Sequence, residues 1–144
     1  MFADFEKSSY RGFASVTVSD YRFTGGAHGN TSYENFNADL KTGKLLTEAD
    51  LFKDSAAAKK KIAELVYAKL VKDYSDRIYP ETSDVKKALT DAGGLDILRF
   101  TKKGLEFQST PYQVGPYAAG VVKVVIPYSE ILDLFKDDVA ERLK

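Results

Sequence analysis

The chain has 144 residues, with 21 basic and 21 acidic side chains, one histidine and no cysteine. A chain of this length is expected to form one domain with its own hydrophobic core. Zero formal net charge argues against an electrostatic surface for nucleic acid, and the lack of cysteine excludes disulfides and thiol catalysis. The apolar runs are far shorter than the ~20 residues that cross a bilayer. We therefore expect a single domain over 1–144, without a nucleic-acid partner and without membrane contact of its own.

The N-terminal part predicts two strands joined by a glycine-rich segment. Residues 10–24 alternate within a β-branched and aromatic stretch, which is typical of a strand. Residues 24–29 contain three glycines, so the backbone there can take positive φ or approach another surface closely. A second strand is predicted at 31–40. Gly43 then supplies the left-handed residue of a hairpin that leads into a short strand at 44–46.

One helical turn at 47–52 precedes the clearest helix, at 56–74, which either Asp54 or Ser55 caps. Apolar residues repeat along this helix at three- and four-residue steps and form the predicted core stripe, namely Ala58, Ile62, Leu65, Val66 and Leu70. Its lysines fall mainly on the other faces, and we interpret them as a solvated surface rather than a ligand patch. A shorter helix is predicted at 83–89.

The C-terminal part predicts a hairpin, a strand and a helix. Segments 95–100 and 105–108 flank a turn in which Gly104 stands where a type I turn with a bulge needs glycine. Residues 121–126 are apolar on both faces with one exception, which is typical of a central strand. A terminal helix begins near Pro127. These elements together predict an α+β fold with an antiparallel or mixed sheet and helices packed on one face.

His28 is the only histidine, and it lies in the glycine-rich segment. A metal site would therefore depend on carboxylates, and no nucleophile turn accompanies a serine–histidine–aspartate scheme. The glycines do not match a nucleotide-binding motif. We expect no metal and no cofactor. Two interpretations of His28 remain open: a turn residue that bonds nearby backbone, or a hydrolase residue in a functional loop with Gly25, Gly26 and Gly29.

Residues 107–122 are sixteen consecutive uncharged residues in a chain that is 29% charged. Their tyrosines and prolines, Tyr112, Tyr117, Pro111 and Pro116, offer rigid apolar area at small entropy cost. The segment is therefore either a recognition surface or a crossover packed against the sheet with its tyrosine hydroxyls at the rim. In the first interpretation these four residues bind a partner.

Three groups of motifs together resemble one family. They are TGGAHGN at 24–30, then NADLKTGKLL at 37–46 with DLF at 50–52, then YQVGPYAAG at 112–120 with IPY at 126–128. In this order and spacing they resemble the C-terminal domain of the bacterial anti-sigma factor RsiV, which is shared with the peptidoglycan deacetylase PdaC and with uncharacterised envelope proteins. The resemblance covers about residues 20–135. Residues 1–19 look like the end of a companion domain that usually precedes it.

The resemblance implies an extracytoplasmic domain that is periplasmic, secreted or membrane-anchored, so we expect an export signal or anchor upstream in the full gene. In RsiV-like proteins this domain binds lysozyme as a sensor and inhibitor, and the contacting proline and tyrosine match the segment of Pro111, Tyr112, Pro116 and Tyr117. Lysozyme is strongly basic and this chain is neutral, so charge complementarity does not contribute to that expectation.

Deacetylase activity in such proteins belongs to a separate catalytic domain whose metal ligands this chain lacks. We therefore predict a non-catalytic extracytoplasmic binding domain, without catalytic residues, whose partner is a protein, with lysozyme as one possibility, or a cell-wall glycan. The alternatives are a hydrolase that uses His28 and an accessory structural domain of an envelope protein.

Overall fold

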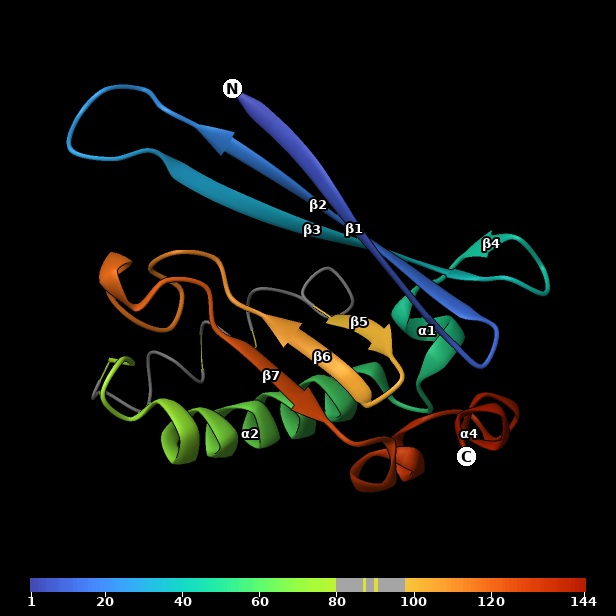
Figure 1. Ribbon diagram of the computed structural model, residues 1–144. Coiled ribbons are helices and arrows are strands. Elements are labelled where there is room, and N and C mark those ends of the chain that lie inside the picture. Colours follow the sequence, from blue (N-terminus) through green and yellow to red (C-terminus); the bar gives the residue numbers. More distant parts are fainter. Residues whose placement is uncertain (80–86, 88–89, 91–97) are drawn as a thin grey trace.

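The computed structural model describes residues 1–79, 87, 90 and 98–144 (Figure 1). Most of the helix expected at 83–89 and the first residues of the hairpin segment expected at 95–100 lie outside the described residues. The described strands form two antiparallel sheets. Together with the helices they make an α+β fold, which confirms the predicted class.

The four-stranded sheet has the order β1-β2-β3-β4 and consists of β1 (Phe2–Tyr10), β2 (Phe13–Arg22), β3 (Asn30–Asp39) and β4 (Lys44–Leu45). The three-stranded sheet has the order β5-β6-β7 and consists of β5 (Leu98–Thr101), β6 (Gly104–Gln108) and β7 (Lys123–Ile126). The helices are α1 (Glu48–Leu51), α2 (Ser55–Tyr74) and α4 (Asp137–Leu143), with short 3-10 turns at Tyr117–Ala119, Tyr128–Glu130 and Leu132–Leu134.

The two sheets and α2 are arranged as three layers (Figure 1). β5 contacts β1, β2 and β3 on one side of the three-stranded sheet, while α2 contacts β7. The core lies between these layers, where the rings of Phe13 and Phe100 stack with their centroids 4.9 Å apart. The four-stranded sheet extends beyond the three-stranded sheet at the end where β1 begins (Figure 1).

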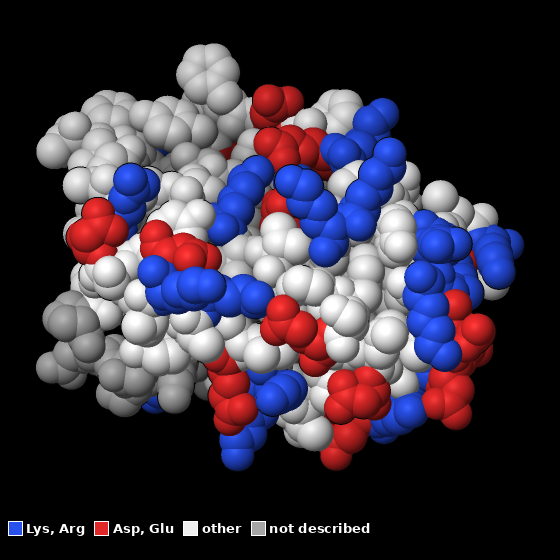
Figure 2. All heavy atoms as spheres, turned by 60° about the horizontal axis from the view of Figure 1, so that its bottom comes forward, with Lys and Arg blue, Asp and Glu red and all other residues white. Residues whose placement is uncertain are grey.

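The helix predicted at 56–74 corresponds to α2. Asp54 caps it by accepting a hydrogen bond from the Ala57 amide at 3.0 Å. The predicted core stripe is confirmed, because four of its five members are buried and Leu65 is half-buried against the core. Figure 2 brings the lower side of Figure 1 forward and shows acidic side chains interspersed among the basic ones. This mixture agrees with the interpretation of the lysines as a solvated surface.

The N-terminal strands differ from expectation in two respects. The strand predicted from residue 10 begins at Phe13, because Arg11 and Gly12 have positive φ and form the turn of the β1–β2 hairpin. β1 itself was not predicted. Residues 1–19, which the resemblance suggests as the end of a companion segment, form β1 and the first part of β2 within the four-stranded sheet.

Two C-terminal predictions are wrong. Among the described strands β7 lies at the edge of its sheet and not at the centre, since β6 is its one neighbour there, and its burial alternates accordingly. The continuous terminal helix is interrupted, because Phe135 is extended and forms an isolated bridge with Phe52. The bridge is flanked by backbone hydrogen bonds from Lys53 to Leu134 at 3.0 Å and from Lys136 to Leu51 at 2.8 Å. This pairing excludes helical geometry at that point.

Candidate binding site

The uncharged loop between β6 and β7 is anchored at its base and at its centre. The Ser109 amide donates to the Val122 carbonyl, and the Ser109 hydroxyl accepts from the Val122 amide, both at 2.9 Å. At the centre, Val114 is buried and its carbonyl accepts from the Tyr79 amide at 2.9 Å. Gly115 packs so closely on the Arg77 carbonyl that a Cβ atom would collide with it. These contacts fix the loop and leave its tyrosines at the surface.

Tyr112 and Tyr117 of this loop meet His28, and we call these three residues the aromatic cluster. The rings of His28 and Tyr117 are stacked, with centroids 3.6 Å apart and an interplanar angle of 11°. The Tyr112 hydroxyl lies 3.0 Å from Nε2 of His28. Tyr112 and Tyr117 nevertheless remain 50% and 38% exposed. The two segments that the sequence analysis treated separately therefore form one surface.

The two prolines of this loop differ in burial and in local structure. Pro111 is half-buried beside Tyr112, whose backbone has a φ of 68°, a conformation that costs a non-glycine residue free energy. Pro116 is exposed and begins the 3-10 turn of Tyr117–Ala119, in which its carbonyl accepts from the Ala119 amide at 2.8 Å. All four residues predicted to bind a partner thus lie on this one loop.

The glycines of residues 24–29 have both roles that the sequence analysis considered. Gly25 and Gly26 are exposed and have φ values of 99° and 103°. Gly29 is buried, and an added Cβ atom would collide with the ring of Tyr21. The first two glycines allow the turn. The third allows the backbone next to His28 to approach the ring of Tyr21 closely.

Both ring nitrogens of His28 are engaged. Nδ1 lies 3.1 Å from the Gly29 carbonyl, which can only accept, so Nδ1 carries the proton and Nε2 accepts from the Tyr112 hydroxyl. Within the described part of the chain His28 has no carboxylate partner. Its contact with Gly29 agrees with the interpretation as a turn residue that bonds nearby backbone. The triad arrangement of a hydrolase is not assembled among these residues.

In residues 1–79, 87, 90 and 98–144, no group of three or more histidine, aspartate or glutamate side chains is arranged so that it could hold a metal ion. Within the same ranges no helix has the length and apolar character to span a bilayer.

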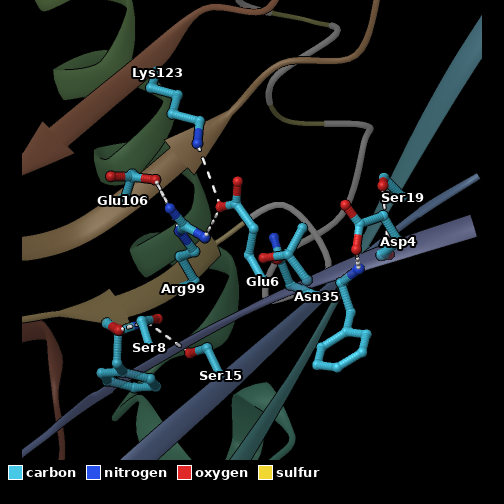
Figure 3. A network of polar contacts seen from close by, with 12 residues as sticks. Asp4, Glu6, Ser8, Ser15, Ser19, Asn35, Arg99, Glu106 and Lys123 are labelled. Atoms are coloured by element: carbon cyan, nitrogen blue, oxygen red, sulfur yellow. Dashed lines mark hydrogen bonds and ion pairs between the residues drawn. The ribbon is translucent and has the colours of Figure 1, made fainter.

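A network of charged side chains between the sheets was not predicted (Figure 3). Arg99 on β5 forms ion pairs of 2.7 Å with Glu6 on β1 and with Glu106 on β6. Lys123 on β7 approaches Glu6 at 3.5 Å. The hydrogen bond from Arg99, with a smaller effect of Lys123, holds the pKa of Glu6 below its ordinary value. Arg99 and Glu6 are far apart in the sequence, so no local motif could indicate the network.

Comparisons with known proteins show to which family the chain belongs. The chain belongs to the family described as protein of unknown function (DUF3298), whose model matches residues 49–129. It is 27% identical, over 135 residues, to the peptidoglycan-N-acetylmuramic acid deacetylase PdaC of Bacillus subtilis. The match covers 90% of this chain and 27% of PdaC, so the chain spans about a quarter of that relative.

Two solved structures share the fold. A DUF3298 family protein of Pseudomonas aeruginosa PAO1 has a TM-score of 0.65 and 21% identity, with 95% of this chain and 62% of that chain covered. A DUF3298 family member of Bacteroides fragilis has a TM-score of 0.68 and 23% identity, with 99% and 57% covered. The chain therefore spans about three fifths of each. The predicted relationship to PdaC is confirmed, and the likeness to RsiV stays a prediction.

Proposed function

We propose that this chain is a non-catalytic extracytoplasmic domain that binds a protein partner through the aromatic cluster. The single observation that carries this proposal is the stacking of His28 on Tyr117 beside the exposed ring of Tyr112. Tyrosine side chains that are already held in place lose little entropy when a partner covers them. Such aromatic anchors dominate the binding energy of protein interfaces.

The composition of the loop supports a protein partner. No charged residue lies between Phe107 and Val122, and the centres of protein interfaces are similarly depleted of charge and enriched in tyrosine. An uncharged surface gives little electrostatic steering, so the affinity is expected to change little with salt concentration.

The proposed location and partner rest on relatives. PdaC acts on peptidoglycan according to its name, which supports a place at the cell envelope for this chain. The resemblance to RsiV suggests lysozyme as the partner to test first, with contacts from the loop of Tyr112 and Tyr117. A role as a hydrolase is less well supported, because Nε2 of His28 already accepts a hydrogen bond from Tyr112.

The test is a calorimetric titration of lysozyme against the parent chain and the Tyr117→Ala variant. Loss of an anchor at the centre of an interface is expected to cost at least ~2 kcal/mol, about thirtyfold in affinity. Phe36→Ala is the matched control, because Phe36 is 40% exposed on β3 and is not part of the aromatic cluster. Its affinity for lysozyme is expected to equal that of the parent.

Melting curves of the same variants separate binding from folding. Tyr117→Ala is expected to melt close to the parent, since the side chain is partly exposed. A sharp fall in its melting temperature would assign the tyrosine to the structure and favour an accessory domain. If lysozyme does not bind the parent, lysozyme is not the partner. If peptidoglycan fragments bind in its place and Tyr117→Ala weakens them, the partner is a glycan.

A further inference from the structure

The inner side of the four-stranded sheet carries polar side chains where a sheet core is usually apolar. The antiparallel register aligns them in three cross-strand rows, which are Ser8–Ser15–Asn37, Glu6–Thr17–Asn35 and Asp4–Ser19–Tyr33. Residues paired in this way lie on the same face of the sheet. The rows therefore form one continuous polar surface across β1, β2 and β3.

The first row binds the backbone of β5. The Ser8 hydroxyl donates to the Phe100 carbonyl at 2.7 Å, and the Ser15 hydroxyl accepts from the Phe100 amide at 2.8 Å. The Asn37 amide group donates to the Leu98 carbonyl at 3.0 Å. In the second row, Glu6 pairs with Arg99. Polar groups of these rows thus meet partners on the three-stranded sheet.

The third row lines an open cleft instead. The cleft has a volume of about 240 Å³, and its walls include Asp4, Ser19 and Tyr33 together with Glu6 and Thr17 of the second row. The opposite wall comes from the three-stranded sheet and the end of the uncharged loop, namely Gln108, Val121 and Lys123. Figure 3 shows Asp4 and Glu6 reaching out from β1 while Lys123 reaches toward Glu6 from the other side. Because drug-sized ligands occupy about 300–1,000 Å³, this cleft suits a single small ring.

Gln108 provides an independent sign that the cleft receives a ligand. Its side chain is only 6% exposed, and its Oε1 atom has no hydrogen-bond partner among the described residues. A buried acceptor without a donor destabilises the fold, and such groups recur at functional sites. The oxygen itself is buried, but its residue lines the cleft, so a turn of the amide group toward a ligand hydroxyl or amide N–H there would give the oxygen a donor.

Acidic and basic side chains both lie around the cleft. Asp4 and Glu6 are negative and Lys123 is positive, while Arg99 behind Glu6 is shared between Glu6 and Glu106. Burial, with a smaller effect of the Glu6 charge, raises the pKa of Tyr33, so its hydroxyl stays protonated and can donate. One small space is therefore lined by the Tyr33 hydroxyl and the Lys123 ammonium as donors, by hydroxyl, carbonyl and carboxylate oxygens as acceptors and by the apolar Val121 side chain.

We propose that this cleft between the two sheets binds one ring of a neutral, hydroxylated sugar. The donors and acceptors of its walls suit the hydroxyl groups of such a ring, and the Gln108 carbonyl oxygen accepts from one hydroxyl or acetamido N–H. The site is separate from the aromatic cluster, so sugar binding and protein binding can be lost independently.

The test is a titration of the chain with triacetylchitotriose and with cellotriose, monitored by amide resonances. Millimolar binding of either trisaccharide, with shifts at Val121, Lys123 and Tyr33, is the expected result. Tighter binding of triacetylchitotriose would indicate that an acetamido N–H is the donor to the Gln108 oxygen. Equal binding of the two sugars would indicate that a hydroxyl is the donor. If neither trisaccharide shifts these resonances, the proposal is wrong. It is also wrong if the resonances respond only to a blocked alanine dipeptide, which offers amide groups but no sugar ring.

Three variants make the test independent of folding. Gln108→Met keeps the length of the side chain and removes the unpartnered acceptor, so sugar binding is expected to weaken at least about tenfold while the melting temperature does not fall. Ser19→Ala removes a hydroxyl from the cleft, and Ser32→Ala removes one from the opposite face of the same sheet. Ser19→Ala is expected to weaken binding and Ser32→Ala to leave it unchanged. Equal affinity of all three variants and the parent would contradict the proposal.

Discussion

Gly29 is the residue at which the path of the glycine-rich segment is most constrained. A Cβ atom added at Gly29 would collide with the ring of Tyr21, whereas one added at Gly25 or Gly26 would meet open space. The three glycines therefore resist substitution for two different physical reasons. At Gly25 and Gly26 the reason is positive φ, and at Gly29 it is the approach of another side chain.

We predict that Gly25→Ala and Gly29→Ala each lower the free energy of unfolding, the first by about 1 kcal/mol because alanine is strained at positive φ. The two losses should respond differently to a second change. In a Tyr21→Ala background the loss caused by Gly29→Ala should largely disappear, since the ring it meets is gone. The loss caused by Gly25→Ala should persist. Urea unfolding of the parent, of Tyr21→Ala and of each glycine variant in both backgrounds measures both losses, and identical behaviour of the two glycines would contradict this account.

Arg142 connects the C-terminal helix α4 to the four-stranded sheet through polar contacts. Arg142 makes two hydrogen bonds to the Asp39 carboxylate, at 2.8 and 3.0 Å, and one to the Gly12 carbonyl at 3.1 Å. Its guanidinium also lies 3.8 Å from the centroid of the Phe13 ring. The hydrogen bonds from Arg142 hold the pKa of Asp39 below its ordinary value of 3.8.

We predict that Asp39→Asn lowers the free energy of unfolding by about 2 kcal/mol at neutral pH, the range for hydrogen bonds to charged groups. A carboxylate with a lowered pKa in the folded state stabilises the fold above its ordinary pKa, and this contribution disappears as the pH falls through the lowered pKa. The difference between parent and variant should therefore be constant near pH 7 and shrink below pH 3.8.

Glu141→Gln on the same helix is the control, because Glu141 pairs with Lys144 at the exposed surface. Such a pair contributes less than about 1 kcal/mol. Denaturant midpoints of both variants between neutral and acidic pH give the comparison. If the Asp39→Asn difference grew toward low pH, the ion pair with Arg142 would not be its cause.

The elements that could be predicted are those whose signals are local. α2 has its cap, its apolar stripe and its length in one continuous stretch, and the hairpin of β5 and β6 depends on Gly104. β1 was missed because it is a largely exposed edge strand, whose side chains have little burial to enforce a pattern. The break in the terminal helix depends on Phe52, which lies far from Phe135 in the sequence.

At the scale of the whole molecule, Arg99 connects the two sheets. It pairs with Glu106, whose side chain is 14% exposed, and with Glu6, whose side chain is 60% exposed. The more buried pair has the larger effect on stability when one member is removed, because the remaining charge is poorly solvated. The exposed pair is screened by water.

We predict that Arg99→Leu lowers the free energy of unfolding by about 3 kcal/mol, whereas Glu6→Gln lowers it by less than about 1 kcal/mol. Replacing Glu106 by leucine as well should recover most of the first loss, since the uncompensated charge is then removed. Chemical denaturation of the single and double variants provides the measurement. If the double variant were no more stable than Arg99→Leu alone, the unpaired Glu106 carboxylate would not be the cause of the loss.

The candidate site could be predicted only in part. Tyr112 and Tyr117 were singled out because a long uncharged run is visible in the sequence, and His28 because it is the only histidine. The Tyr112 hydroxyl and the His28 ring belong to positions 84 residues apart, and their contact depends on how the β2–β3 loop and the β6–β7 loop meet in three dimensions. The polar cleft has no sequence signal of its own, since its walls come from strands of both sheets.

Hydrogen–deuterium exchange of the chain with and without saturating lysozyme tests the central claim most directly. If the aromatic cluster is the binding surface, lysozyme should slow exchange in peptides that cover residues 24–29 and 109–120 and leave α2 unchanged. Formation of a complex that protects α2, or that leaves both of these segments as exposed as before, would contradict it.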